Sequence, residues 1–288
     1  MLTDISDVLA DPVDGSPLSL DSDSSRLESS SGRYYDVAGP GYATLTVDEV
    51  HTDRADDDGM VTARETFLSR GHYAPFVEAV TGAVQLALDD AGVADDERPV
   101  ICEIGAGTGY YLSHTLDDVD GARGVGIDLS VPAAERLATC HPRVGAVVAD
   151  ARHRLPLRDS SVDVITVVFS PSNPEEFARV LRPGGQVVVL TAEAGHLTEL
   201  REPLGILDVP EGKVEQLVES SSGWFEAVGE PELVEFTMRL DQESIATQTG
   251  MSPSARHIPS DLLAERAAQL PDHMSLTARA TVTRLRVR

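Results

Sequence analysis

Short runs of apolar residues alternate with segments of helical spacing between residues 99 and 190. The runs at 100–104 and 162–169 are rich in valine and isoleucine, which is typical of strands buried on both faces of a parallel sheet. Helices must then cover both faces of that sheet. The pattern predicts an α/β fold with strands at 99–104, 124–127, 145–149, 162–169 and 186–190, and with helices at 110–116, 132–140 and 175–181.

The segments on either side of this region have different patterns. Residues 61–92 show apolar positions at helical spacing, interrupted at Gly71 and Pro75, which predicts a short helix, a turn and a second helix ending near Gly92. Residues 201–288 are less regular, and we expect insertions there to shape an acceptor pocket. They predict helices near 213–218 and 261–270, and strands near 233–240 and 277–287 that close the sheet in antiparallel fashion.

The first 60 residues differ in composition from the rest. They contain 14 acidic residues against three arginines, and serines are frequent between positions 22 and 31. Short extended pieces at 33–37 and 42–45 predict a small, weakly cored strand unit. We therefore expect a separate N-terminal region at 1–60 and a larger domain at 61–288.

Composition and charge limit the classes of protein. The chain has 41% apolar and 25% charged residues, no run of about 18 apolar residues, and an N-terminus without a signal-peptide pattern, so we expect a cytoplasmic protein that does not enter a membrane. Cys102 and Cys140 alone cannot form a disulfide framework or complete a zinc site. The net charge of −25, with Lys213 as the only lysine, opposes nucleic-acid binding, unless the acidity reflects only solubility.

The most specific motif is a glycine-rich turn between a predicted strand and a predicted helix. It runs from Glu103 through Gly105 and Gly107 to Gly109, and glycines allow a backbone to approach a ligand closely. Asp128 ends the next strand about 20 residues on, where a carboxylate accepts hydrogen bonds from ribose hydroxyls. A ligand-free tight turn is the alternative interpretation. The two signals together favour a nucleotide site.

The spacing of these glycines argues against a dinucleotide. A dinucleotide motif has its last glycine three residues after the second, whereas Gly109 follows Gly107 by two. Glu103 is also poorly placed for a pyrophosphate, but it suits a ligand with a positive centre and an amino group. S-adenosylmethionine (SAM) has both.

Further motifs extend this interpretation. The glycine turn, Asp128, Asp150-Ala151, and the segments 155–157, 161–163 and 181–185 together resemble the class I SAM-dependent methyltransferases over residues 61–200. The resemblance implies a Rossmann-like sheet with helices on both faces and SAM as cofactor. It also implies that Asp128 contacts the ribose and that Asp150, beside Ala151, lies at the adenine amino group.

A narrower resemblance concerns two segments outside the turn. Residues 63–75, which include Arg64 and Tyr73, and the pair His196-Leu197 resemble the large-subunit rRNA guanine-N1 methyltransferases. The resemblance implies that Tyr73 and His196 contact SAM alongside Gly107 and Thr108. A core aromatic for Tyr73 and a helix-start residue for His196 are the alternatives. The family resemblance also implies that Met251 and Arg256 lie in a loop above the active site.

The N-terminus of that family is a zinc ribbon, and its skeleton is recognisable here without its ligands. The four ligand positions correspond to Asp11, Asp14, Ser29 and Arg33, whereas structural zinc sites favour thiolate and imidazole. We expect a degenerate ribbon that binds no zinc. Because the ribbon is thought to help the family hold RNA, its erosion weighs against an RNA substrate.

The catalytic residues are not evident from the sequence. Asn173, in the segment 169–174 after the fourth strand, is a candidate for orienting an amine or amide, or else the N-cap of the following helix. His196 is the second candidate. Methyl transfer from a sulfonium needs an in-line nucleophile and positioning more than a strong acid or base.

The sequence therefore favours a SAM-dependent methyltransferase that acts on a small-molecule acceptor. The alternatives are an rRNA guanine-N1 methyltransferase, a SAM-dependent cyclase or lyase that attacks SAM itself, and a non-enzymatic SAM-binding protein. The charge disfavours RNA as a partner, and a homodimer is left open.

Overall fold

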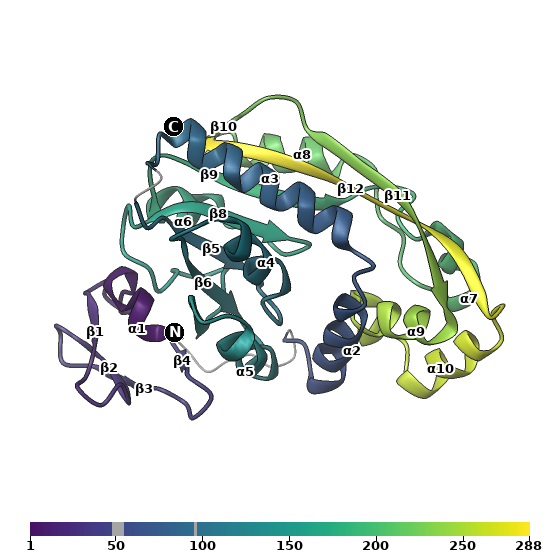
Figure 1. Cartoon of the computed structure of the whole chain (residues 1–288), viewed down its shortest axis with the longest axis horizontal. Helices are drawn as coiled ribbons and strands as arrows, with labels where there is room; N and C mark the ends of the chain where they lie inside the picture. The colour runs from purple at the N-terminus through teal and green to yellow at the C-terminus, as the bar shows by residue number, and fades with distance from the viewer. Residues whose placement is uncertain (48–54, 95–96) are drawn as a thin grey trace.

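The computed structural model describes residues 1–47, 55–94 and 97–288. Its centre is a nine-stranded sheet in the order β10-β12-β9-β8-β5-β6-β7-β4, with β11 paired to β12 (Figure 1). The predicted strands run parallel in its middle: β5 (Val100–Ile104), β6 (Arg123–Asp128), β7 (Val144–Val148), β8 (Val162–Val168) and β9 (Leu181–Ala192). Every residue of β5, β7 and β8 is buried, as their valine-rich sequences predicted.

Two hydrophobic clusters cover the two faces of the sheet. In β5, Ile101 joins the cluster formed with α3 (Ala74–Ala91) and α4 (Tyr110–Asp118), while Val100 and Cys102 join the cluster on the opposite face. That second cluster includes residues of α1 (Leu2–Ile5) and α6 (Pro174–Val180). The alternation follows from the two-residue period of a strand, and it confirms the layered α/β fold.

The helical segment before the sheet has the predicted form. α2 (Asp58–Ser69) is followed by a turn and by α3, which ends at Gly92 with a left-handed φ of 71°. α5 (Val131–Cys140) begins after Ser130, whose hydroxyl accepts a hydrogen bond from the Ala133 amide as an N-cap.

The C-terminal part closes the sheet as expected. β12 (His273–Val287) pairs antiparallel with β9, β10 (Phe225–Ala227) and β11 (Glu232–Asp241). The predicted helices are α8 (Lys213–Ser221) and α10 (Ser260–Ala268). The sequence interpretation did not include α7 (Arg201–Leu204), α9 (Gln242–Gly250) or the single turn η4 (Pro253–Arg256).

The N-terminal segment forms a small sheet but also joins the large one. β1 (Leu18–Leu20), β2 (Arg26–Ser29) and β3 (Tyr34–Asp36) make a three-stranded antiparallel sheet, seen beside the main body in Figure 1. β4 (Tyr42–Thr44) instead pairs parallel with β7, at the edge of the large sheet. The strand piece near 42–45 is therefore not part of the small sheet. Residues 48–54 of the expected N-terminal region at 1–60 lie outside the described part.

None of the helices in the described ranges has the length and apolar character that crossing a bilayer requires.

Candidate active site

The site lies where the strand order reverses. The chain passes from β5 to β6 and β7 on one side, then returns to β8 on the other side of β5. In open α/β sheets, ligands bind at the carboxyl ends of the strands at such a point. Gly105 follows β5 and Ser170 follows β8, and a Cβ on Gly105 would collide with the Ser170 hydroxyl. The Ser170 side chain therefore occupies the space that a side chain on residue 105 would need.

Asp128 fixes the glycine turn at the end of β6. One of its carboxylate oxygens accepts a hydrogen bond from the Gly107 amide and the other from the Ser130 amide, each at 2.8 Å. Gly105 and Gly107 have left-handed φ values of 67° and 55°, which side chains rarely adopt. Burial raises the pKa of Asp128, while both backbone donors lower it.

The last residues of the turn face the protein interior. A Cβ on Gly109 would lie 2.5 Å from Cys140 Sγ and 2.8 Å from Leu137 Cδ1, so glycine is required there for packing against α5. Thr108 is also buried. Gly107 is different, because a Cβ at that position would lie 3.2 Å from Nη1 of the Arg64 side chain and not against the buried face of α5.

Glu103 lies behind the turn. Glu103 is 1% exposed, and its carboxylate accepts a hydrogen bond from the Leu112 amide of α4 at 2.9 Å. Burial raises the pKa of Glu103 to about 8. At least one carboxylate oxygen of Glu103 therefore faces α4, and the expected contact with a ligand's amino group stays a prediction.

An ion-pair cluster joins distant segments beside Gly107. Asp56 pairs with Arg64 of α2 at 2.6 Å and with Arg256 of η4 at 2.8 Å. Arg64 also donates to the Met251 carbonyl, and the Ser130 hydroxyl donates to the Asp56 carbonyl at 2.6 Å. The loop with Met251 and Arg256 thus lies close to the turn. Sequence reasoning missed Asp56, which is one of several consecutive acidic residues with no distinguishing pattern.

Tyr73 and His196, which are 123 positions apart, come together as a pair. The Tyr73 hydroxyl lies 3.3 Å from His196 Nε2, and His196 Nδ1 accepts a hydrogen bond from the Arg279 amide at 3.0 Å. Burial lowers the pKa of His196 to about 4, so the imidazole is neutral at pH 7. Because Nδ1 is an acceptor, Nε2 of the neutral imidazole carries the proton and donates a hydrogen bond to the Tyr73 oxygen.

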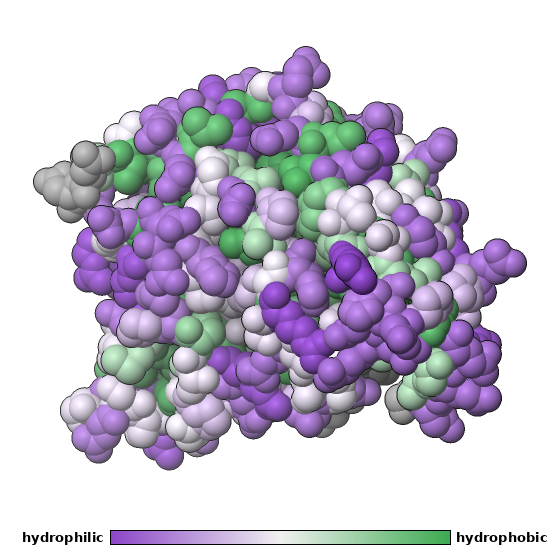
Figure 2. Space-filling model, turned by 45° about the vertical axis from the view of Figure 1, so that its right-hand side comes forward, coloured by the Kyte–Doolittle hydropathy of each residue, from purple (hydrophilic) through white to green (hydrophobic). Residues whose placement is uncertain are grey.

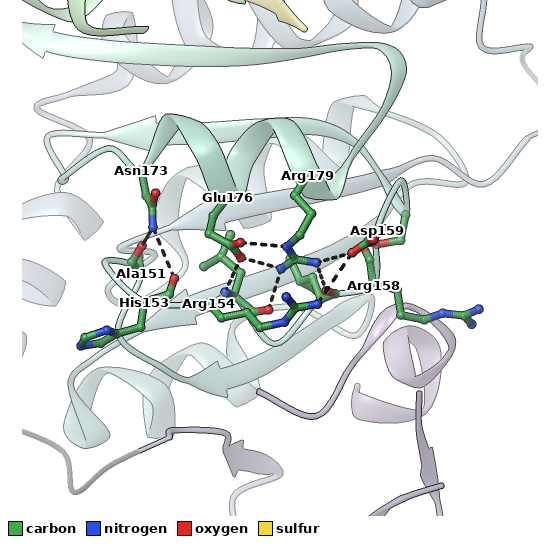
Figure 3. Close-up of polar contacts among 11 residues, drawn as sticks. Ala151, His153, Arg154, Arg158, Asp159, Asn173, Glu176 and Arg179 are labelled. Carbon is green, nitrogen blue, oxygen red and sulfur yellow. Dashed lines mark hydrogen bonds and ion pairs between the residues drawn. The ribbon is translucent and has the colours of Figure 1, made fainter. Parts of the chain in front are cut away.

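Asn173 holds a loop rather than capping a helix. It occupies the N-cap position of α6, but its side-chain nitrogen donates to the carbonyls of Ala151 at 2.9 Å and His153 at 3.3 Å (Figure 3). The carboxylate of Asp150 in the same loop accepts from the Arg152 amide. The amide nitrogen of Asn173 is therefore committed to positioning residues 150–153.

The same loop is fixed a second time by Arg179, near the C-terminal end of α6. Arg179 pairs with Glu176 and with Asp159 at 2.7 Å, and it donates to the carbonyls of Leu155 and Leu157 (Figure 3). The connection between β7 and β8 is thus held against α6 at both of its ends.

The four positions of the degenerate ribbon also converge. Arg33 Nη1 lies 2.6 Å from Asp14 and 3.3 Å from Asp11, and the Arg33 amide donates to Ser29 Oγ. Asp11 is fully buried and accepts a second hydrogen bond from the Tyr35 hydroxyl at 2.9 Å. The Arg33 guanidinium therefore pairs with both carboxylates, Asp11 and Asp14. Within the described ranges, no group of three or more His, Cys, Asp or Glu side chains is arranged to hold a metal ion.

Comparison with known proteins identifies the family. Residues 101–185 match a family described as a methyltransferase domain. The chain is 39% identical to a 23S rRNA (guanine(748)-N(1))-methyltransferase of Streptomyces fradiae, over 89% of each chain. It is 38% identical, over 96% of each chain, to a protein of Micromonospora griseorubida named for guanine-N1 methylation of 23S rRNA without a base number.

The chain also resembles a solved SAM-dependent methyltransferase from Thiobacillus denitrificans in complex with S-adenosyl-L-homocysteine, which is 15% identical. The alignment covers 73% of this chain and 91% of that one with a TM-score of 0.44. The identities to the two curated relatives extend over 89% and 96% of this chain. The protein therefore belongs to the family of class I SAM-dependent methyltransferases that includes the 23S rRNA guanine-N1 methyltransferases.

Proposed function

We propose that this methyltransferase transfers the methyl group of SAM to N1 of a guanine in 23S rRNA. The observation that carries the proposal is the identity to two relatives named for that reaction over 89% and 96% of the chain. In the sequence analysis, the loss of the ribbon's zinc ligands was an argument against an RNA substrate. That objection is weakened because Asp11, Asp14 and Arg33 form ion pairs between the same positions.

We further propose that SAM binds along the glycine turn. Each carboxylate oxygen has two lone pairs, so Asp128 retains acceptor capacity for ribose hydroxyls beyond its two backbone hydrogen bonds. Glu103 and Gly109 support the turn from inside. The remaining residues proposed to line the cofactor are those named from the sequence: Tyr73, Gly105, Gly107, Thr108, Asp150, Ala151 and His196.

The electrostatics of the Tyr73–His196 pair suit a cationic ligand. When bound, SAM supplies an electrophilic methyl carbon on a positively charged sulfur. Because burial keeps His196 neutral at pH 7, the imidazole does not repel that charge. Burial also raises the pKa of Tyr73, so the phenol stays protonated.

The reaction requires mainly the alignment of the acceptor. The N1–methyl bond of guanine forms while the methyl–sulfur bond breaks, so S-adenosylhomocysteine leaves as the neutral thioether and the N1 proton passes to water. Holding N1 in line with the methyl group converts a bimolecular step into an effectively unimolecular one. We assign Asn173 to positioning of the loop at 150–153, through its two carbonyl contacts, rather than to contact with the acceptor.

A small-molecule acceptor is the second candidate function. The net charge of −25 favours it, because the mean field of the protein repels a phosphate backbone. Both relatives are named as methyltransferases, which favours methyl transfer over a cyclase, a lyase or a non-enzymatic SAM-binding protein. An rRNA acceptor would imply a cytoplasmic location.

Methyl-tritiated SAM distinguishes the two acceptor classes. Purified protein is incubated with unmodified 23S rRNA in one reaction and with a small-molecule cell extract in another. Label in the rRNA that is absent with Asp128→Ala supports the proposal. Label that appears only in the small-molecule fraction overturns it and restores the second candidate.

A further inference from the structure

Phe169 combines an uncommon backbone conformation with an exposed ring. It follows β8 directly and has a φ of 51°, which bulky side chains rarely adopt. Among the described residues, Ser24, Ser160 and Leu197 are the other non-glycine residues with positive φ, so Phe169 is the one aromatic residue in this set. The residue is nevertheless 44% exposed. Burial therefore does not account for a large apolar residue at this position.

The backbone around Phe169 is fixed at the active site. The Phe169 amide donates to the Leu190 carbonyl of β9 at 3.1 Å, which keeps the residue in register with the sheet. The next residue, Ser170, fills the space beside Gly105. Phe169 therefore lies one residue from the contact between the two strand ends that flank the crevice.

One side of the ring rests on a cluster of buried aromatic side chains. Its centroid lies 5.9 Å from that of Phe76 at an interplanar angle of 72°, 6.3 Å from that of Tyr73, and 6.1 Å from that of His196. The contact with Phe76 is edge-to-face, an arrangement that aromatic pairs prefer, and it holds the ring in place. A ring that is held on one side and exposed on the other provides a pre-organised stacking surface.

We propose that Phe169 is the surface on which the acceptor guanine stacks. The inference rests on the proposed function and identifies the residue that holds the base. The contact of Phe169 with Tyr73 and His196 places it beside the residues proposed to line SAM. Stacking on an aromatic side chain holds a base without a cationic contact, which suits a chain with a net charge of −25.

Three variants of Phe169 separate stacking from a structural role. Phe169→Gly removes the ring and also relieves the positive φ, which offsets part of the packing lost against Phe76, Tyr73 and His196. We expect it to raise KM for rRNA roughly ten- to hundredfold with an unchanged Kd for SAM. Phe169→Ala should behave in the same way, whereas Phe169→Trp should retain KM within a few-fold. Trp224→Ala is the matched control, because Trp224 is 41% exposed outside the site.

A binding measurement keeps this inference separate from the proposed function. Guanosine monophosphate is titrated into protein saturated with S-adenosylhomocysteine, and no methyl transfer is needed for the readout. Weaker binding to Phe169→Gly than to the wild type and Trp224→Ala supports stacking, even if rRNA is not methylated. Equal binding by all three proteins, or no binding to the wild type, overturns the inference.

Discussion

The buried carboxyl group of Glu103 shows how a motif residue acts from behind the site. Residues 101 and 103 lie on the same face of β5, and Ile101 packs toward α3 and α4. The two-residue period of a strand therefore directs Glu103 toward α4, where the Leu112 amide binds it. The sequence analysis considered Glu103 only for contact with a ligand, and its hydrogen bond to α4 comes from the structure.

The raised pKa of Glu103 gives a prediction for stability against pH. Its pKa is 4.5 in an unfolded chain and about 8 in the fold, so the folded state binds the extra proton between these values. Stability from this group therefore falls as pH rises from about 4.5 through about 8. Glu103→Gln cannot ionise and should remove that decline.

Denaturant unfolding of both proteins at pH 5, 7 and 9 measures the difference. The variant should match the wild type at low pH and exceed it by a few kcal/mol at pH 9. A constant difference across the pH range would show that Glu103 keeps its ordinary pKa.

Asp128 is the residue on which SAM binding should depend most. Its carboxylate both fixes the Gly107 amide and retains lone pairs for the ribose. Asp128→Ala should weaken SAM binding by roughly 1.5–3 kcal/mol, the worth of hydrogen bonds to a charged group. Asp128→Asn should lose less, because it keeps one acceptor oxygen. Calorimetric titration tests both variants, and unchanged affinity in Asp128→Ala would refute the assignment.

At the scale of elements, periodic segments were predictable and irregular ones were not. α2 and α3 follow from apolar positions at helical spacing, and β5 and β8 from their valine and isoleucine content. α9 was missed because Ile245 and one alanine are the only apolar side chains in its sequence, QESIATQTG, so it shows no apolar repeat at helical spacing. β4 was assigned to the wrong unit because its partner, β7, lies about 100 residues further along the chain.

The degenerate ribbon carries a prediction about metal. An arginine is a poor zinc ligand, and Arg33 already pairs with Asp11 and Asp14. Purified protein should contain no stoichiometric zinc, and a chelator should leave its melting temperature unchanged. Elemental analysis that finds one zinc ion per chain would contradict this account of the ribbon.

The ion pairs themselves give a second test of the ribbon. Asp11→Ala leaves the Tyr35 hydroxyl and the Arg33 guanidinium without their buried acceptor. We expect a loss of about 1–3 kcal/mol in the free energy of unfolding. Asp23→Ala, an exposed change in the same small sheet region, is the control and should have little effect. Equal stability of both variants would show that Asp11 does not hold the unit together.

At the scale of the whole molecule, charge sets how RNA is held. Polar residues cover most of the face shown in Figure 2, and apolar residues occupy small separate areas. The chain has 23 basic and 48 acidic side chains, and many arginines already pair with carboxylates, including Arg64, Arg179 and Arg256. Among the described residues, these pairs reduce the number of cations available to phosphates, so we expect contacts to the base to supply more of the affinity.

Salt dependence measures that balance directly. Six or more phosphate contacts would weaken binding roughly 1,000-fold or more between 50 and 200 mM salt. We expect a much smaller change for this protein and its rRNA substrate, measured by filter binding. A steep loss would indicate a local basic patch that the mean charge conceals.

The central claim is that guanine N1 of 23S rRNA accepts the methyl group, and nucleoside mass spectrometry tests it most directly. Unmodified rRNA is treated with the protein and SAM, digested to nucleosides and compared with rRNA treated with Asp128→Ala. The account predicts N1-methylguanosine in the first sample and none in the second. Methylation of another base or another guanine atom, or no methylated nucleoside at all, would contradict it.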